Sequence, residues 1–352
     1  MKMRSIISLM LCLCLTAAVL VGCGGNASKP TENVTEAATS AETKTDGIDY
    51  MVLVNKTHKL PDDWEEKLET VHMTNSVGDD VETEKKAYDA YLKLKADLEK
   101  DGIHVDLDSA RRSVADQQRI MDDFTKQYGK DYALKTVATP GYSEHHTGFA
   151  LDLYLIIDGK DITENEDMVQ YPEIWSKIHA KLADYGFILR YLEGREYITG
   201  YGYEPWHIRY IDNVDTAKEI MSKDITFEEY LGAYKGGKVD IDYGTSSIYK
   251  EDELKDAVIQ IECRFASLDG CVLKSIRYAG DEAVTDEKLK AINEHNPDSK
   301  YTQIVEFLMD FHTPVNTGDT TFESDRDYTD YQWWLARTAD SGWEIVSFGY
   351  GA

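Results

Sequence analysis

The sequence predicts an α+β protein built from two domains. Its 352 residues, 42% hydrophobic and 29% charged, are enough for a sizeable core and for more than one domain. Between 48 and 233, segments with helical periodicity alternate with short apolar runs typical of strands. The polar, glycine-containing segment 234–249 has the composition of a linker. We therefore expect a first domain at 48–233 and an accessory α+β domain at 250–352.

The helices of the first domain are predicted from their apolar spacing. From Glu82 to Lys100, apolar side chains recur at steps of three and four residues, and Gly102 follows as a stop signal. Further helices are predicted at 114–128, at 174–185 and at 217–234, the last with a break near Asp224.

Short apolar runs between these helices predict the strands, at 50–54, 104–107, 148–157 and 208–211. The run 148–157 has the pattern of a buried strand, with apolar side chains at Phe149, Leu151, Leu153, Leu155 and Ile157.

The accessory domain is predicted to begin with a helix from Glu251 to Phe265. Strand-like runs rich in aromatic residues follow at 303–311, 331–337 and 343–350. A helix followed by such strands is similar to small cystatin-like or NTF2-like domains of secreted bacterial proteins. Its tryptophans are expected in the core, with a carbohydrate-binding or wall-binding surface as the alternative. We find no second catalytic group of residues in this domain.

The balance of charge limits the classes of partner. Acidic residues number 65 against 38 basic ones, which gives a formal net charge of −27. Phosphate binding needs clustered Lys and Arg, so the composition argues against a nucleic-acid-binding protein. The charge is otherwise consistent with a soluble surface.

The N-terminal residues have the layout of an export signal. Lys2 and Arg4 precede an apolar run from Ile6 to Val21, which is short for a membrane-spanning helix. The run ends in Leu20-Val21-Gly22-Cys23, which resembles the lipobox of bacterial lipoproteins. Residues 1–22 would then be the signal peptide, and Cys23 would carry the lipid. Residues 23–47 lack large apolar side chains and are expected to be a flexible tether.

The lipobox resemblance predicts a protein anchored by its lipid to the extracellular face of a bacterial cell membrane. Two acyl chains on one residue suffice for stable anchoring, whereas one chain binds only marginally. A plain signal peptide with an incidental cysteine is the alternative. Outside residues 1–23 only Cys263 and Cys271 remain, and they are expected either to form a disulfide or to stay as free thiols.

One half of a metal site is indicated by the segment S-E-H-H-T-G-F-A-L-D at 143–152. Gly148 permits a tight turn into the strand. Asp152 lies among leucines, where a carboxylate is costly unless it is paired or bound to a metal. Consecutive side chains of extended backbone point to opposite faces, so only one of His145 and His146 can face a metal. By itself this segment also fits an ordinary strand with exposed histidines.

A second half is indicated by Y-E-P-W-H-I-R-Y at 203–210. Glu204 precedes His207 by three residues, Pro205 stiffens the link, and Trp206 supplies a large rigid side chain. A carboxylate at this spacing from a zinc-binding histidine can lie beside the metal-bound water. Alone, this segment also fits a strand with a buried tryptophan.

Together, the two halves resemble a known family. The pattern S-x-H-x-x-G-x-A-x-D followed by E-x-W-H resembles the VanY-type D-alanyl-D-alanine carboxypeptidases, a family of zinc peptidases. Segments 53–56, 109–117 (SARRSVADQ), 184–191 and 198–207 resemble the family in the same order. The resemblance covers roughly 50–232 and implies a small antiparallel sheet with flanking helices.

The resemblance implies that Zn²⁺ is bound by His145, Asp152 and His207. The spacing to Gly148 and Asp152 selects His145 rather than His146. Glu204 would be the general base and later the proton donor.

The resemblance also implies the surroundings of the substrate. Arg112 would contact the substrate carbonyl or the terminal carboxylate. Arg111 occupies a position where the family usually has Tyr, which leaves a choice between the two arginines; alignment favours Arg112. Substrate-binding roles are implied for Gln117, Ser143 and Trp206.

The implied function is a zinc-dependent D,D-carboxypeptidase that removes the terminal D-Ala of peptidoglycan stem peptides. A related alternative is an L,D-carboxypeptidase acting on tetrapeptide stems. An alternative of another class is a non-catalytic peptidoglycan-binding lipoprotein, against which the intact set of ligands and Glu204 argues.

Overall fold

A computed structural model describes residues 47–128, 137–316, 322–339 and 341–351. The predicted signal peptide, lipidated Cys23 and nearly all of the tether lie outside the described residues. Within the described residues, no helix has the length and apolar content needed to span a bilayer.

The first domain is built on an antiparallel sheet with the strand order β3-β4-β7-β6. In addition, β5 pairs with residues 155–157 at the end of β4. The strands are β3 (His104–Ser109), β4 (Ala150–Ile157), β5 (Lys160–Ile162), β6 (Phe187–Leu189) and β7 (His207–Tyr210). A separate hairpin joins β1 (Thr70–Thr74) to β2 (Asp80–Glu84). The structure thus confirms a small antiparallel sheet within an α+β domain.

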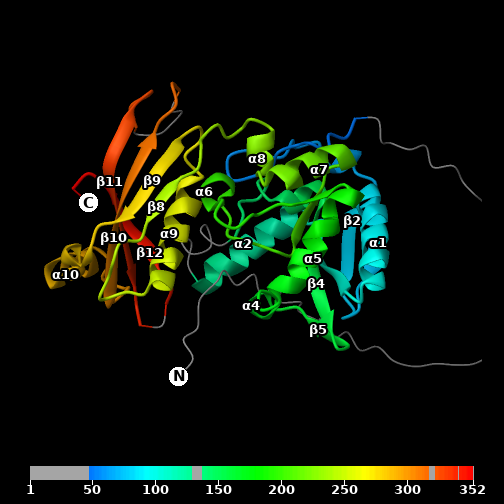
Figure 1. Cartoon of the computed structure of the whole chain (residues 1–352), viewed down its shortest axis with the longest axis horizontal. Helices are drawn as coiled ribbons and strands as arrows, with labels where there is room; N and C mark the ends of the chain where they lie inside the picture. Colours follow the sequence, from blue (N-terminus) through cyan, green and yellow to red (C-terminus); the bar gives the residue numbers. More distant parts are fainter. Residues whose placement is uncertain (1–46, 129–136, 317–321, 340, 352) are drawn as a thin grey trace, which may run out of the picture.

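Helices surround this sheet (Figure 1). They are α1 (Lys85–Lys100), α2 (Val114–Tyr128), α4 (Asn165–Met168), α5 (Pro172–Leu182), α6 (Glu196–Thr199), α7 (Val214–Lys223) and α8 (Phe227–Tyr230). Short 3₁₀ turns lie at η1 (Glu65–Lys67), η2 (Glu144–Thr147) and η3 (Ala183–Tyr185). The break near Asp224 is confirmed, because this residue adopts φ 52° and ends α7.

Two predictions for this domain need correction. The helix expected from Glu82 begins only at Lys85, since residues 80–84 form β2 and Glu84 caps the helix by accepting from the Ala87 amide. The strand expected at 50–54 is absent from that segment. There the carbonyls of Tyr50 and Val52 accept hydrogen bonds from Arg209 Nη2 instead of pairing with a strand.

The second domain contains a five-stranded sheet in the order β12-β11-β10-β9-β8. The strands are β8 (Asp240–Asp242), β9 (Val272–Tyr278), β10 (Gln303–His312), β11 (Asp327–Arg337) and β12 (Glu344–Gly349), and only the β8–β9 pair is parallel. The helices are α9 (Glu251–Phe265) and α10 (Asp286–His295), with the short turn η4 (Asp281–Ala283). Trp333, Trp334 and Trp343 are buried, as expected for core residues. Cys263 and Cys271 are free thiols.

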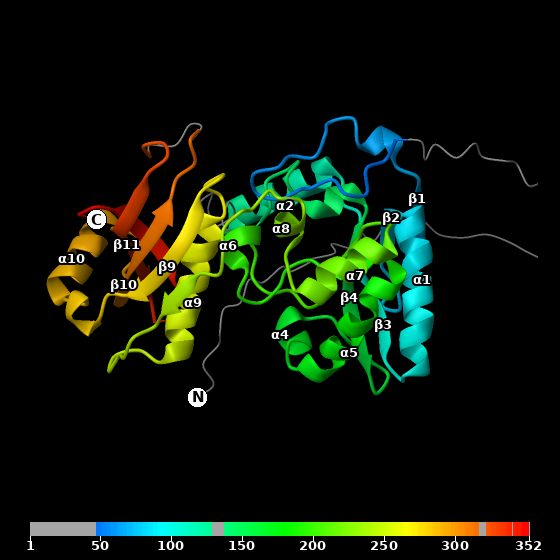
Figure 2. The same cartoon turned by 45° about the horizontal axis from the view of Figure 1, so that its top comes forward.

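The segment 234–249, expected as a linker, contributes to the second domain. It contains β8, and Val239 and Tyr249 are buried in that domain's core. The two domains meet where α6 lies beside α9 (Figures 1 and 2). Tyr197 and Ile198 of α6 are buried in the core of the second domain. The helix that precedes the Glu204 segment is therefore held by the accessory domain.

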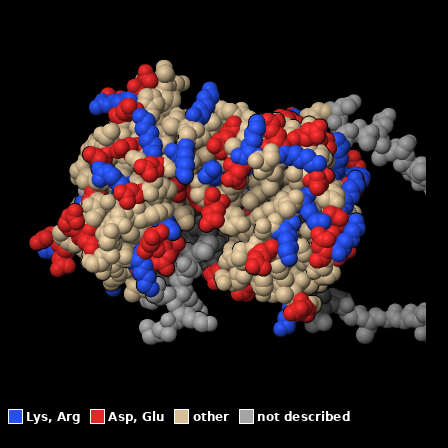
Figure 3. Space-filling view, viewed as in Figure 1, with Lys and Arg blue, Asp and Glu red and all other residues tan. Residues whose placement is uncertain are grey.

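On the face seen in Figure 3, the acidic side chains are spread out and do not form a single patch. Figure 3 shows acidic and basic side chains interspersed over the visible face of both domains. This distribution is consistent with the interpretation of the net charge as a solubility feature.

Candidate active site

Strand pairing brings the two sequence halves of the site together. Asp152 of β4 and His207 of β7 are direct partners in the antiparallel register. His145 lies in the turn η2, which ends at Gly148 with φ 77° and leads into β4. A Cβ at Gly148 would lie 3.2 Å from Cβ of Glu84, so both the turn and the packing require glycine there.

The three predicted ligands converge on one point. His145 Nε2 lies 3.2 Å from Asp152 Oδ2, and His207 Nδ1 lies 3.0 Å from Asp152 Oδ1. One ligand atom from each residue lies within 4.8 Å of the others. All three residues are buried. Across the described ranges, no other group of three His, Cys, Asp or Glu side chains meets this criterion.

Hydrogen bonds on the outer ring nitrogens decide which nitrogens face inward. His145 Nδ1 donates to the Ala110 carbonyl at 2.6 Å, and His207 Nε2 donates to Glu144 Oε2 at 3.1 Å. In their neutral forms, with these protons in place, His145 Nε2 and His207 Nδ1 present lone pairs toward Asp152. Asp152 Oδ1 is buried, and although His207 Nδ1 lies 3.0 Å away, it forms no well-aligned hydrogen bond among the described residues. Two imidazole nitrogens and a carboxylate converging in this way form the donor set that Zn²⁺ prefers.

The charges and protonation states of the three clustered residues are compatible with a bound metal cation. Burial lowers the pKa of His145, which favours the neutral imidazole that ligates metals. Burial alone would raise the pKa of Asp152, but His145 and His207 hold it well below its usual range. Burial lowers the pKa of His207, yet Asp152 and Glu144 outweigh it and raise the pKa to about 10. A bound cation would compete with that proton.

Glu204 lies beside the ligands without joining them. Its Oε2 is 3.7 Å from His207 Nδ1, and its side chain is 27% exposed. Its amide donates to the Tyr191 carbonyl at 3.4 Å, and its carbonyl accepts from the His207 amide at 3.2 Å. Burial raises the pKa of Glu204 to about 7. A carboxylate with a pKa near neutrality, reachable by solvent, suits general acid–base catalysis.

The structure separates the roles of the two neighbouring arginines. Arg111 is held by Glu82 at 2.5 Å and by Glu65 at 3.1 Å. Arg112 instead donates to Gln117 Oε1 at 2.9 Å and to Ser109 Oγ at 3.3 Å. Its charge is close enough to lower the pKa values of His145 and Glu204. Arg112 is therefore the cation next to the predicted metal ligands.

His146 supports this arrangement from outside the ligand set. Its Nδ1 donates to the Arg112 carbonyl at 2.7 Å, and its Nε2 accepts from the Gly141 amide at 3.0 Å. Both ring nitrogens are engaged, so His146 is not available as a ligand.

The three residues predicted to bind substrate are all buried. Gln117 accepts from Arg112 and donates to the Ala138 carbonyl at 2.7 Å, so it orients the guanidinium. Ser143 caps the turn η2, and its carbonyl accepts from the His146 amide at 3.1 Å. Trp206 belongs to the hydrophobic core of the first domain. Direct contact of these residues with substrate stays a prediction.

Comparison with known proteins identifies the family to which the chain belongs. The family model for VanY, D-alanyl-D-alanine carboxypeptidase, matches residues 80–213. A D-alanyl-D-alanine carboxypeptidase of Enterococcus faecalis is 30% identical over 220 residues, which span 60% of this chain and 75% of that one. The chain belongs to the VanY family. The family and the enzyme class predicted from the sequence, a metallopeptidase of the D-alanyl-D-alanine carboxypeptidase type, are thereby confirmed.

Other VanY-like proteins are also similar to this chain. The bifunctional D-Ala-D-Ala dipeptidase and carboxypeptidase VanXYC of Enterococcus gallinarum is 36% identical over 138 residues, 38% of this chain and 67% of that protein. A crystal structure of a mutant of the vancomycin resistance D,D-pentapeptidase VanY with Zn(II) is 29% identical. It has a TM-score of 0.43 and covers 52% of this chain and 98% of that chain.

One buried residue of this VanY-family site escaped the sequence analysis. Glu144 lies between Ser143 and His145 and binds His207. The sequence signal that could have revealed it is a charged residue directly before a predicted ligand and close to a buried strand. Its partners Arg190 and Arg209 gave no such signal, because they lie 46 and 65 residues away along the chain.

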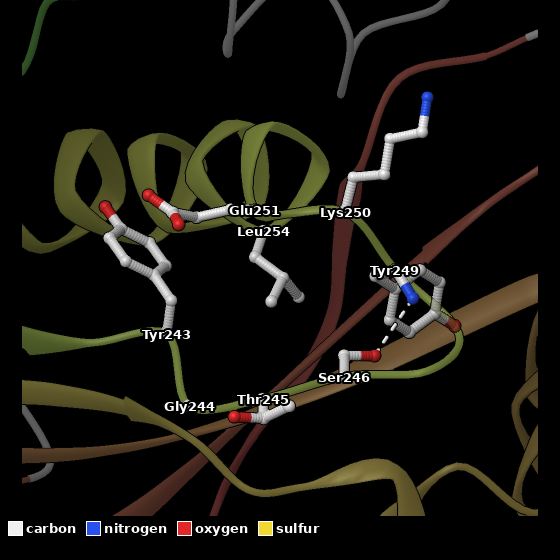
Figure 4. A pocket seen from close by; sticks show the side chains of 8 residues that line it. All are labelled: Tyr243, Gly244, Thr245, Ser246, Tyr249, Lys250, Glu251 and Leu254. Carbon is white, nitrogen blue, oxygen red and sulfur yellow. Dashed lines mark hydrogen bonds between the residues drawn. The ribbon is translucent and has the colours of Figure 1, made fainter.

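A separate hollow of about 320 Å³ lies in the second domain, where β8 leads into α9 (Figure 4). Its lining includes Tyr243, Ser246, Tyr249 and Leu254, and the Tyr249 amide donates to Ser246 Oγ there. None of the predicted site residues lines this hollow, so it is not part of the VanY-family site.

Proposed function

We propose that this chain is a zinc-dependent D,D-carboxypeptidase that hydrolyses the terminal D-Ala of peptidoglycan stem peptides. The observation that carries the proposal is the convergence of His145, Asp152 and His207 with Glu204 beside them. The likeness to the Enterococcus faecalis D-alanyl-D-alanine carboxypeptidase supports the substrate class.

The metal would be held by His145 Nε2, the Asp152 carboxylate and His207 Nδ1, which leaves room for water and substrate oxygen. Bound zinc lowers the pKa of a coordinated water to about 7 and polarises a carbonyl oxygen. The Ala110 carbonyl keeps the His145 imidazole oriented by accepting from its outer nitrogen.

Glu204 and Arg112 carry the proton transfer and the charge stabilisation. Glu204 accepts a proton as the oxygen of water adds to the amide carbon, and Arg112 stabilises the negative charge that develops on the carbonyl oxygen. Glu204 then gives the proton to the nitrogen of the leaving D-Ala. The C–N bond breaks, the new carboxylate stays on the shortened peptide, and D-Ala leaves as the free amino acid.

Digestion of two defined peptides tests the proposal. The purified chain, with its zinc content measured, is incubated with a pentapeptide ending in D-Ala-D-Ala and with the corresponding tetrapeptide. Release of D-Ala from the pentapeptide, and its loss in Glu204→Gln, is the expected result. Release from the tetrapeptide alone would favour the L,D-carboxypeptidase. Release from neither by zinc-loaded protein would favour a binding protein.

We also propose that the enzyme is lipid-anchored at the extracellular face of the cell membrane. Support comes from the lipobox-like run ending at Cys23. Metabolic labelling with a radioactive fatty acid tests it. The natural chain should carry label and sediment with membranes, whereas Cys23→Ser should carry none.

For the second domain we propose an accessory module of the cystatin-like or NTF2-like type. Its sheet, antiparallel except for the β8–β9 pair, with α9 packed against it, supports this likeness. The burial of its tryptophans favours a packing role for them over a sugar-binding one.

A further inference from the structure

Glu144 is a charged residue in a place where a charge is costly. Its side chain has no exposed surface, although it neighbours the ligand His145. Its Oε1 accepts from Arg190 Nε at 2.7 Å and from Arg209 Nη1 at 2.8 Å, and its Oε2 accepts from His207 Nε2 at 3.1 Å. A buried carboxylate needs such partners, because without them it takes up a proton.

The two arginines keep Glu144 ionised. Its Oε1 accepts one N–H from each guanidinium group, so its negative charge is paired where it is buried. An ionised carboxylate only accepts hydrogen bonds. The proton of the neutral His207 imidazole must therefore sit on Nε2, which leaves the Nδ1 lone pair facing Asp152.

The arginines are themselves fixed from several elements. Arg190 binds both carboxylate oxygens of Glu228 on α8, at 2.7 and 3.0 Å, and Glu228 also accepts from Asn55 Nδ2 at 3.1 Å. Arg209 Nη2 binds two backbone carbonyls of the 50–52 segment. The positive charges of Arg190 and Arg209 balance the negative charges of the two buried glutamates. The network is therefore neutral when His207 is uncharged.

We propose that Glu144 is a positioning residue for the metal centre. It selects the tautomer and the orientation of His207 that present Nδ1 to the ligand cluster, and it thereby sets the affinity of the site for zinc. The inference rests on the proposed function only for the identity of the metal. It goes beyond that function because Glu144 touches neither the substrate nor the metal.

The substitution Glu144→Gln tests the proposal because it reverses the hydrogen bond to His207. The two arginines need an acceptor, so the amide oxygen of glutamine turns toward them and the NH₂ group faces His207 Nε2. That donor favours a proton on Nδ1, where the ligand lone pair is required. Loss of an outer-shell partner typically weakens metal binding by about 10–100-fold, and we expect that loss here.

Glu228→Gln is the matched control. It removes a carboxylate that is also buried and also bonded to Arg190, but it leaves the contact with His207 intact. Zinc affinity is measured by chelator competition on the full chain, and apoprotein stability by thermal unfolding. Both variants should lower the apoprotein Tm, whereas only Glu144→Gln should lose zinc affinity. Equal loss of zinc affinity in both variants, or none in Glu144→Gln, would overturn the proposal.

A spectroscopic measurement on the natural chain requires no variant to fold. Nitrogen-15 NMR of the zinc-loaded protein reports the protonation state of each histidine ring nitrogen. We expect His207 to carry its proton on Nε2, and a proton on Nδ1 would overturn the proposal. Neither measurement uses peptide hydrolysis. A chain that binds zinc as expected but cleaves no stem peptide would refute the proposed function and leave this inference standing.

Discussion

The contact between the two domains contains a carboxylate whose neutralisation is expected to stabilise the protein. Glu262 on α9 is 2% exposed, and its Oε1 has no hydrogen-bond partner among the described residues. Burial and the neighbouring charge of Glu196 on α6 raise the pKa of Glu262 to about 8 from 4.5. The substitution Glu262→Gln keeps the shape of the side chain and removes its ionisation.

The size of the effect follows from proton linkage. A carboxyl group whose pKa is raised on folding contributes its stability fully below the unfolded value of 4.5, and this is lost as the pH rises toward 8. One pKa unit corresponds to about 1.4 kcal/mol, so the upper limit at pH 7 is about 3 kcal/mol. Partial access of water to the buried group reduces this, and we expect a gain of about 1–3 kcal/mol for the glutamine variant.

Thermal unfolding at several pH values measures this gain. The Tm of Glu262→Gln should exceed that of the natural chain by roughly 3–10 °C at pH 8, and the difference should shrink toward pH 5. Glu253→Gln on the same helix is the control, because Glu253 is paired with Arg337 and its pKa is lowered. That variant should lose stability at neutral pH. A Tm difference for Glu262→Gln that does not change between pH 5 and pH 8 would refute the reasoning.

Four further substitutions test the site. Glu204→Gln should lower kcat by 100-fold or more while zinc content, measured by mass spectrometry, stays at the natural level; retained hydrolysis would remove Glu204 from the mechanism. Arg112→Met should lower kcat/KM about 100-fold with little change in Tm, whereas Arg111→Met should mainly lower the Tm, and the reverse pattern would exchange their roles. Gly148→Ala should cost about 1–2 kcal/mol of stability, because its φ is positive and its Cβ would meet Glu84; an unchanged Tm would contradict the strain.

The sequence by itself, through its resemblance to the VanY family, predicted the three residues that the structure brings together in one cluster. The two motifs lie at the ends of β4 and β7, and the alternation of apolar residues fixes which side chains of each strand share a face. The antiparallel pairing then places Asp152 opposite His207. Local spacing also separated His145 from His146, and it located α1, α2, α5 and α9 to within a few residues.

Only the tertiary structure decided how that cluster is held. Arg111 and Arg112 are equivalent in local pattern, and they differ because Glu65 and Glu82 bind one of them. The ligating nitrogen of His207 depends on Glu144, which is 63 residues away along the chain. The support of α6 by α9 depends on packing between two domains. Hydrogen bonds and ion pairs of this kind join residues that lie far apart in the sequence, so no short-range pattern reveals them. A buried polar group needs a partner, and only the folding of the chain brings that partner within reach.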